Sequence, residues 1–172
     1  MKPGHLRLQR LDARHDVSSF TSGSPSGDVW LHRHALAAQQ MDSARTFIAC
    51  RGTKTVGYFS LTMGSVGRTE PPPSLVRGMP RYPIAAVILA RLAIAEEEQG
   101  KGLGARLLAD ALRTAVFAGE AAAARLIVVD ALDDSAAGFY RRHGFVEPIG
   151  TPLRLYRRMK DVRASLAAAS AP

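Results

Sequence analysis

The sequence predicts an α/β fold with a mixed central sheet in a single domain, and three observations carry that prediction. Segments 87–95 and 126–130 are apolar runs of strand length, and the first precedes a long helical pattern and the second a short one. A hairpin pattern spans 45–63, where two strand-like runs meet across a Gly-Thr-Lys turn. Strands that alternate with helices favour parallel pairing, and a hairpin adds antiparallel pairing, so the predicted sheet is mixed.

The first half of the chain is expected to hold one strand, one helix and the hairpin. His5–Leu11 alternates apolar and polar residues, which predicts an opening strand. Ser26 or Asp28 can cap a helix that continues to about Met41. The two hairpin strands are expected at Arg45–Arg51 and Thr55–Met63.

The second half begins with a long connection at 65–83 that carries several prolines. Connections of this length usually line a site or are disordered. The later elements are expected in this order: the strand at 87–95, a helix that begins near Leu103, a strand at Arg125–Ala131, a short helix at Asp133–His143 and closing strands at Phe145–Met159.

Length and composition fit one compact enzyme domain. A chain of 172 residues that is 47% apolar can bury one good core. We expect this domain to cover residues 1–160, and we expect the alanine-rich residues 161–172 to form a flexible C-terminal tail. Cys50 is the only cysteine, which excludes an internal disulfide and a multi-cysteine zinc site and suits a reducing cytoplasm.

No targeting or membrane-spanning segment is expected. The N-terminal residues are charged and lack the apolar core of a signal peptide. The longest apolar run, 84–95, is too short for a span and is interrupted by Arg91. A cytoplasmic protein is therefore the expectation.

A glycine-rich turn, Gly100-Lys101-Gly102-Leu103-Gly104, joins the strand at 87–95 to the helix after it. Glycine lacks a Cβ, so such a turn can adopt positive φ and point successive backbone N–H groups at one anion. The positive end of the helix dipole adds to the same place. The pattern predicts a pyrophosphate-binding loop, and a tight turn without any ligand is the alternative.

The spacing of this loop excludes two common phosphate-binding motifs. A Walker A loop needs Ser or Thr where Gly102 stands, and the dinucleotide motif needs a glycine where Leu107 stands. What remains is Gln99-x-x-Gly102-x-Gly104, which resembles the acetyl-CoA loop of the GNAT superfamily of N-acetyltransferases. The resemblance implies the GNAT fold, with helices on both faces of the mixed sheet, and acetyl-CoA as co-substrate.

A second segment, Phe139-Tyr140-Arg141-Arg142-His143-Gly144-Phe145, also resembles the GNAT superfamily. In these enzymes a tyrosine at this place donates a proton to the departing CoA thiolate, which makes Tyr140 the candidate catalytic residue. A phenol of pKa about 10 keeps its proton at neutral pH, and the thiol that leaves has a pKa of about 8.5. The alternative for Tyr140 is an aromatic side chain packed in the core.

The GNAT resemblance also implies a set of acetyl-CoA contacts. The pantetheine arm of the substrate enters where the strands that carry Arg91 and Val129 splay apart, and it hydrogen-bonds the backbone of the first strand. Asp130 stands near where many GNAT enzymes have an asparagine, so it is assigned no contact. The residues assigned to acetyl-CoA are Leu92, Ala93, Ile94, Gln99, Gly100, Lys101, Gly102, Leu103, Gly104, Ala105 and Phe139.

Most of the chain further resembles the GNAT-type toxins of bacterial toxin-antitoxin pairs, which acetylate the amino group of aminoacyl-tRNA. The matching pieces include Trp30-Leu31, Ala44-Arg45-Thr46-Phe47, Val56-Gly57-Tyr58-Phe59 and Arg91-Leu92-Ala93-Ile94. The sequence departs from the toxins at Ala90, where they have glycine, and at Ser26-Gly27-Asp28-Val29, where they have Leu-Asp. The resemblance implies a toxin that blocks translation and a ribbon-helix-helix antitoxin as partner, and it leaves a homodimer open.

Charge is the second informative feature of the composition. The net charge is +8, and 19 of the 23 basic residues are arginine. This balance favours a polyanionic partner, although a GC-rich coding sequence is an alternative cause. No basic run exceeds Arg141-Arg142-His143, so the fold must assemble any basic surface. As contacts to tRNA we expect Arg45, Arg77 and Arg91.

The lack of an evident general base favours an α-amine as the acetyl acceptor. A lysine amine of pKa about 10.4 is roughly 0.1% neutral or less at pH 7, whereas an α-amine of pKa about 8 is neutral at about the ten-percent level. Glu96-Glu97-Glu98 is the alternative source of a base, but a charge run in a turn is usually solvated. We therefore predict direct attack of the α-amine on acetyl-CoA, with Tyr140 as proton donor and without an acetyl-cysteine intermediate at Cys50.

Two other function classes stay open. The runner-up is a generic GNAT enzyme that acetylates a small-molecule amine or a protein N-terminus, and scattered arginines would favour it. The third is a binding module that uses CoA or nucleic acid only as a ligand. His32 and His34 are two residues apart and face different sides of a helix, so no shared metal site is expected. His143 is interpreted as a cation at a helix C-terminus.

Overall fold

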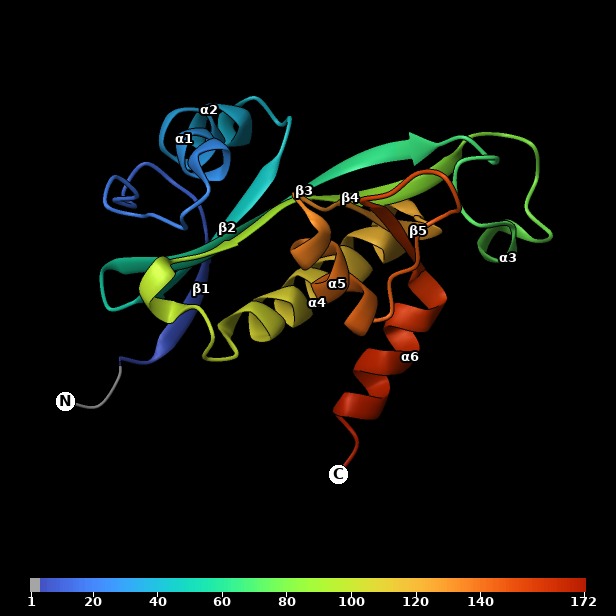
Figure 1. Cartoon of the computed structure of the whole chain (residues 1–172). Helices are drawn as coiled ribbons and strands as arrows, with labels where there is room; N and C mark the ends of the chain where they lie inside the picture. The colour runs from blue at the N-terminus through green and yellow to red at the C-terminus, as the bar shows by residue number, and fades with distance from the viewer. Residues whose placement is uncertain (1–3) are drawn as a thin grey trace. The chain divides into compact units, whose positions relative to one another are not determined.

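The computed structural model describes residues 4–172 and contains a six-stranded mixed sheet in the order β1-β2-β3-β4-β5-β6 (Figure 1). The chain divides into two compact units. Unit 1 takes in the residues up to Thr62 and Ala90–Ala111, and unit 2 takes in Met63–Leu89 and Leu112–Pro172. Three elements carry residues of both units: β3 (Lys54–Val66), β4 (Ile84–Ile94) and α4 (Leu103–Ala122).

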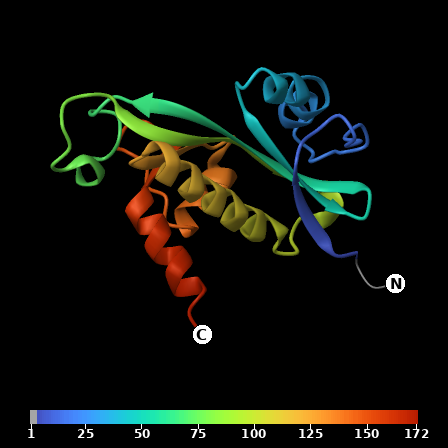
Figure 2. The ribbon, with the colours of Figure 1, turned by 180° about the vertical axis from the view of Figure 1, so that it is seen from behind.

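Unit 1 is built on antiparallel pairing, as the hairpin pattern predicts. β1 (Leu6–Arg10) pairs with β2 (Arg45–Arg51), and β2 pairs with β3 through the turn at Gly52. Helices α1 (Pro25–Arg33) and α2 (Ala35–Gln40) lie beside these strands (Figure 2). One apolar cluster joins helices and strands, since buried residues of both pack together: Leu11, Phe20, Leu31, Ala35, Ile48, Cys50, Tyr58 and Ala95.

The helix expected from Ser26 or Asp28 to Met41 differs from the structure at its start and in its middle. Ser24 is the N-cap residue, because Pro25 has no N–H group and a fixed φ that suits the first helical position. Asp28 instead accepts hydrogen bonds from the backbone N–H and the hydroxyl of Ser22, at 3.0 and 2.6 Å. At His34 the backbone leaves helical geometry, which splits the helix into α1 and α2.

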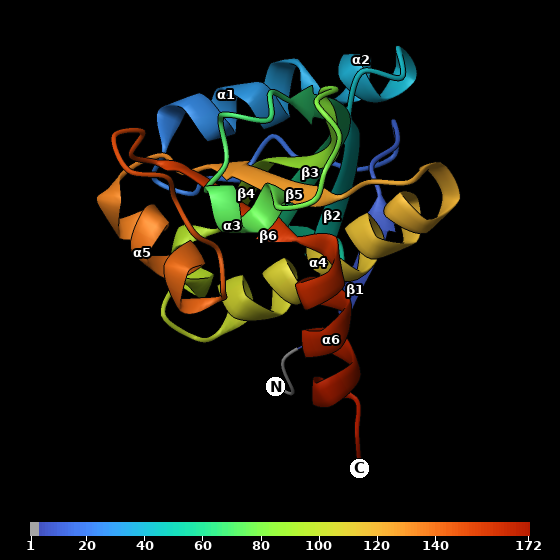
Figure 3. The same ribbon diagram turned by 90° about the vertical axis from the view of Figure 1, so that its right-hand side faces the viewer.

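Unit 2 contains the parallel part of the sheet (Figure 3). β4 runs parallel to β5 (Leu126–Asp130), with Ala86 opposite Leu126, and β6 (Arg154–Arg158) is antiparallel to β5. A buried cluster under these strands includes Ile84, Leu126, Val128 and Tyr156. The helices of unit 2 are the second part of α4, α3 (Pro73–Val76), α5 (Asp134–Arg142) and α6 (Met159–Ala169).

Two expectations about unit 2 need correction in detail. The closing strands expected at Phe145–Met159 reduce to β6 and one isolated bridge between Val146 and Tyr156. The segment expected as a tail, 161–172, contributes most of helix α6, and Val162 in it is fully buried. A buried apolar side chain anchors the first turns of this helix, so fraying beyond them stays a prediction.

The other predicted elements agree with the structure to within a few residues at each end. The connection at 65–83 holds the end of β3 and the short helix α3. No helix within residues 4–172 is long and apolar enough to cross a membrane.

Candidate active site

The glycine-rich turn after β4 has the backbone geometry that anion binding requires. Gly100 and Gly102 adopt φ of +75° and +84°, where L side chains are strained. A Cβ at either position would meet no atom within 4 Å, so the positive φ, and not crowding, calls for glycine. α4 begins at Leu103, and its first amide groups have no acceptor in a preceding turn. The loop therefore presents backbone donors to open space.

The side chain of Gln99 fastens this loop to the rest of unit 1. Its amide nitrogen donates to the backbone carbonyls of Ser22 and Ile94, at 2.8 and 2.9 Å. The backbone N–H of Glu96 donates to the carbonyl of Thr21 at 2.9 Å, which adds a second tie to the same segment. Gln99 thus holds the end of β4 against the segment that precedes α1, and both donors of its amide are engaged.

Two of the three residues in the acidic run before the loop, Glu97 and Glu98, form ion pairs with the β2–β3 hairpin. Arg51 donates to both carboxylate oxygens of Glu98, at 3.1 and 3.3 Å, and Lys54 lies 2.5 Å from a carboxylate oxygen of Glu97. The hydrogen bond from Lys54 lowers the pKa of Glu97 from its ordinary value. These two carboxylates therefore hold the turn in place and are not merely solvated, and their ion pairs disfavour either of them as the general base.

Strand residues 92–94, expected to bind the pantetheine arm, are half-buried in unit 1. Gly57 of β3 lies close to them: a Cβ there would stand 3.2 Å from the Ala93 carbonyl oxygen and 3.0 Å from Leu107. Contacts that short force a neighbour to move. Gly57 is thus needed for the close approach of β3 to the strand and helix on either side of the loop.

A stacked column that sequence reasoning missed lies beside this strand. The guanidinium of Arg91 lies 4.8 Å from the centre of the Trp30 ring, and Trp30 stacks on Tyr58 with ring centres 6.1 Å apart. The Tyr58 hydroxyl donates to the Gly27 carbonyl at 2.8 Å. The column explains how an arginine is accommodated within the central apolar strand β4, since its charge faces an aromatic ring. Burial raises the pKa of Tyr58 to about 12.

The other two arginines expected to contact tRNA differ in how they are engaged. Arg45 donates to the Gln39 carbonyl at 3.0 Å and forms an ion pair with Asp42, so its side chain ties β2 to the end of α2. Arg77 follows α3 in unit 2 and is exposed. Arg45 and Arg91 belong to unit 1, so the three arginines do not form one cluster within a single unit.

Tyr140 lies on α5 in unit 2 and is 6% exposed. Its ring meets Phe139 and Phe145 edge-on, with centres 5.2 and 5.7 Å apart. Burial raises the pKa of Tyr140, and no hydrogen bond or charged neighbour within residues 4–172 acts on its hydroxyl. The phenol therefore holds its proton at neutral pH, and its hydroxyl forms no hydrogen bond with any described residue.

The sequence around Tyr140 explains why the helix forms and where it ends. The carboxylate of Asp133 accepts from the Ala136 amide at 2.8 Å, which caps the N-terminus. At the other end a ring nitrogen of His143 lies 2.8 Å from the Phe139 carbonyl, and Gly144 has φ of +88°. His143 is therefore a helix-terminal residue, as its position in the sequence predicts.

The surroundings of Cys50 and His32 give both residues a role in the fold. Cys50 lies in the buried cluster of unit 1, and burial raises the pKa of its thiol, which disfavours the thiolate needed for an acetyl-cysteine intermediate. His32 lies with a ring nitrogen 2.9 Å from the Phe20 carbonyl. Across the described residues, 4–172, no group of three or more His, Cys, Asp or Glu side chains is placed to hold a metal ion.

The residues expected at the site thus divide by unit. Unit 1 brings together the acetyl-CoA contacts expected on β4 and on the glycine-rich turn, with Arg91 and the Trp30 column beside them. Unit 2 holds Tyr140 and Phe139 on α5.

The sequence matches one family model over more than half of its length. Residues 42–147 match the acetyltransferase (GNAT) domain. A curated relative, the tRNA-acetylating toxin of Mycobacterium tuberculosis (strain ATCC 25618 / H37Rv), is 40% identical over 161 residues, which cover 94% of this chain and 96% of the relative.

Solved structures are similar over nearly the whole chain. AtaT complexed with acetyl-methionyl-tRNAfMet is similar with a TM-score of 0.86 and 27% identity, over 94% of this chain and 99% of AtaT. A tyrosine-to-phenylalanine mutant of the toxin AtaT, bound to the C-terminus of the antitoxin AtaR and to acetyl-CoA, is similar with a TM-score of 0.82 and 26% identity, over 95% of this chain and 99% of that one.

Proposed function

The chain belongs to the acetyltransferase (GNAT) domain family, and from this membership we propose that it moves an acetyl group from acetyl-CoA to the α-amino group of aminoacyl-tRNA and so blocks translation as a toxin. The observation that carries the substrate class is the 40% identity to a tRNA-acetylating toxin across 94% of the chain. The likeness to AtaT bound to an acetylated tRNA supports the same class.

The turn at Gly100–Ala105 is the proposed site for the pyrophosphate of acetyl-CoA. Two glycines at positive φ and the free amide groups at the start of α4 supply donors and a positive dipole end. The exposed Lys101 adds a cation to the same turn. The half-buried backbone of Leu92, Ala93 and Ile94 is the proposed contact for the pantetheine arm, and Gln99 acts as a positioning residue that holds the loop.

Tyr140 is the proposed proton donor to the CoA thiolate. In the reaction the α-amine attacks the thioester carbonyl, the carbon–sulfur bond breaks, and the electron pair leaves on sulfur. A phenol in water is a weaker acid than a thiol by only about 1.5 pKa units, so the proton moves to sulfur as the carbon–sulfur bond breaks, and the phenolate then recovers a proton from solvent. A phenol that stays protonated and whose hydroxyl forms no hydrogen bond within the described residues suits that step.

The proposed acceptor needs no strong base. Glu97 and Glu98 are held in ion pairs, so neither is placed as a free carboxylate for proton removal. An α-amine is partly neutral near pH 7, so water suffices to accept its second proton. Arg91 and Arg77 are the proposed phosphate contacts, and Arg45 is the weakest of the three candidates because Asp42 already pairs with it.

The proposed partners and location follow from the same class. A cognate antitoxin is proposed because the relative AtaT binds the C-terminus of AtaR. The cytoplasm is proposed because charged tRNA and acetyl-CoA are found there.

The decisive experiment compares acceptors. The purified protein is given radiolabelled acetyl-CoA with a pool of charged tRNA, with free amino-acid esters, or with peptides that have a free N-terminus. We expect efficient transfer to charged tRNA alone, and nuclease digestion followed by mass spectrometry should locate the acetyl group on the α-amine. Equal transfer to free esters or peptides would instead establish the generic N-acetyltransferase.

A salt series identifies the phosphate contacts. Log affinity for charged tRNA should fall with log salt by about 0.7 per phosphate contacted on single-stranded RNA. Arg91→Gln and Arg77→Gln should each lower that slope by about one contact, whereas the exposed Arg33→Gln on α1 should leave it unchanged. An unchanged slope in both variants would remove these arginines from the interface.

A further inference from the structure

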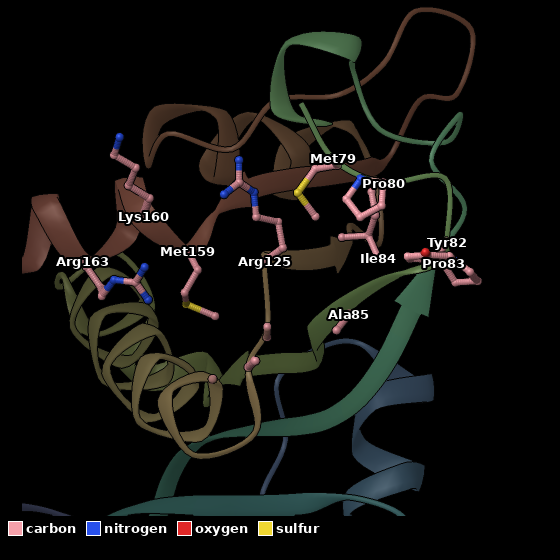
Figure 4. A pocket seen from close by; sticks show the side chains of 13 residues that line it. Met79, Pro80, Tyr82, Pro83, Ile84, Ala85, Arg125, Met159, Lys160 and Arg163 are labelled. Atoms are coloured by element: carbon pink, nitrogen blue, oxygen red, sulfur yellow. The ribbon is translucent and has the colours of Figure 1, made fainter. Parts of the chain in front are cut away.

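Unit 2 contains a hollow of about 480 Å³ that the proposed reaction does not use (Figure 4). It lies at the amino ends of β4 and β5, where Ile84 opens one strand and Arg125 precedes the other. The chain segment from Met79 to Ala85 forms one wall, and the first turns of α6 form another. All of its lining residues belong to unit 2.

Small side chains at the end of α4 line this hollow and allow α6 to approach closely. Gly119, Ala123 and Ala124 line the hollow, and a Cβ at Gly119 would stand 3.1 Å from the methyl carbon of Met159. Ala123 adopts φ of +60°, a left-handed conformation that usually takes glycine at the end of a helix. Strained residues of this kind persist where the surroundings hold them, and they cluster at functional sites.

The hollow is positively charged and has no internal counter-charge. Arg125, Lys160 and Arg163 line it, and no acidic residue does. None of the three forms an ion pair within residues 4–172, and the Nε of Arg125 is buried without a hydrogen-bond partner. In Figure 4 the Arg125 side chain stands between Met79 on one side and Lys160 on the other. Buried donors of this kind are normally satisfied, so an acceptor from outside the chain is the expected partner.

Aliphatic side chains lie between these cations. Met79 is half-buried, Ile84 and Met159 are almost fully buried, and Tyr82 is 73% exposed at the edge. Methionine fills irregular contacts, and Tyr, Met and Arg are enriched at protein interfaces. A single-stranded nucleotide would stack its base on an aromatic ring, and the one aromatic side chain among the lining residues, Tyr82, stands at the edge and not between the three cations.

We propose that this hollow is a docking site for an acidic peptide segment of a partner protein, in which one apolar side chain enters between Met79, Ile84 and Met159 while flanking carboxylates bind Arg125, Lys160 and Arg163. The arrangement has the form of an interface hot spot, with an apolar anchor in the centre and charges at the rim. The proposal does not depend on the acetyl acceptor, because the hollow lies outside the glycine-rich turn and the Tyr140 helix.

The test uses fluorescence anisotropy on the full-length chain with four labelled probes. The first is the peptide Glu-Asp-Leu-Asp-Glu, the second has Ser in place of Leu, the third has Lys in place of each acidic residue, and the fourth is a pentauridylate. We expect the first probe to bind with a Kd below about 1 mM, and the Ser probe about tenfold or more weaker, because burial of Leu is lost. The other two should bind less tightly than the first.

Variants assign that binding to the hollow. The double change K160Q with R163Q, both on the surface of α6, should weaken the first probe about tenfold, and Met79→Ser should weaken it while leaving the Ser probe unchanged. R33Q removes a charge from α1, outside the hollow, and should change affinity less than twofold. Acetyl transfer to charged tRNA should be unaltered in all of these variants.

Three outcomes would overturn the proposal. The first is the absence of saturable binding of the acidic Leu peptide up to about 5 mM. The second is equal binding of that peptide before and after the K160Q and R163Q changes. The third outcome is tighter binding of pentauridylate with the same dependence on these residues, which would assign the hollow to RNA. Thermal unfolding of each variant shows whether it is folded, and Met79→Ser provides an independent test if the charge variants do not fold.

Discussion

Tyr58 in unit 1 and Tyr140 in unit 2 are both buried, and they differ in what their hydroxyl groups do. Tyr58 in unit 1 donates to the Gly27 carbonyl and lies in a column with Trp30 and Arg91. Tyr140 in unit 2 packs against two phenylalanines, and its hydroxyl has no hydrogen bond within residues 4–172. A buried hydroxyl that is bonded stabilises the fold, whereas a hydroxyl without a partner in the protein is available to a substrate.

The difference also limits what burial alone can indicate. Burial raises the pKa of both tyrosines, so a raised pKa does not distinguish a catalytic tyrosine from a structural one. The distinguishing feature is the partner of the hydroxyl. We infer that Tyr58 stabilises the structure of unit 1 and that Tyr140 takes part in the reaction.

The largest expected effect comes from closing the proposed acetyl-CoA site, which Tyr140 requires for its role. Gly104→Glu places a carboxylate among the amide groups of the loop, where it repels the pyrophosphate. At a separation of about 4 Å near a protein surface this repulsion approaches 4 kcal/mol, so affinity should fall by about a hundredfold or more. Isothermal titration with acetyl-CoA measures it.

A matched variant controls for added charge in that experiment. Ala169→Glu places the same carboxylate at the exposed end of α6 and should leave acetyl-CoA affinity unchanged. Equal affinity in Gly104→Glu and the wild type would show that the pyrophosphate binds elsewhere.

The next effect concerns stability. Tyr58→Phe removes the donor to the Gly27 carbonyl and leaves a half-buried acceptor without its partner. The free energy of unfolding should fall by about 1–2 kcal/mol. Urea unfolding followed by circular dichroism measures this loss. A variant as stable as the wild type would contradict the structural role of Tyr58.

Alkaline pH gives the most gradual effect. The pKa of Tyr58 rises from 10 to about 12 on folding, because burial disfavours the phenolate. A folded-state pKa above the unfolded value means that the stabilisation is fully present below about pH 10 and is lost as pH rises toward 12. The free energy of unfolding should therefore decline above pH 10, and Tyr58→Phe should show a shallower decline. Parallel curves for the two proteins would argue against the buried neutral phenol.

Much of the fold could be predicted because its signals are local. Alternation of apolar residues predicts β1, and the turn at Gly52 predicts the hairpin. The spacing of the glycines predicts the positive φ at Gly100 and Gly102. The break between α1 and α2 was missed, since no Gly or Pro stands at His34 to indicate it. The early start of α1 could have been found, because Ser24 followed by Pro25 is a common helix start.

The contacts that position the site were harder to predict, because they join residues far apart in sequence. Gln99 bonds Ser22, 77 residues away, and no periodicity relates the two. The stacking of Arg91 on Trp30 likewise depends on the packing of α1 beside the sheet. The pairing of Arg45 with Asp42 is different, since a separation of three residues could have indicated that this arginine is already engaged.

The most direct test of the two tyrosine roles measures turnover and acetyl-CoA binding in matched hydroxyl deletions. Tyr140→Phe and Tyr58→Phe each remove one oxygen atom, and both are assayed with charged tRNA at saturating acetyl-CoA, with rates divided by the folded fraction. We predict that kcat falls by roughly 10² to 10⁴ in Tyr140→Phe with acetyl-CoA affinity unchanged, because general-acid catalysis is lost, and that kcat in Tyr58→Phe stays within about threefold of the wild type. Wild-type turnover by Tyr140→Phe, or an equal loss in both variants, would contradict this assignment.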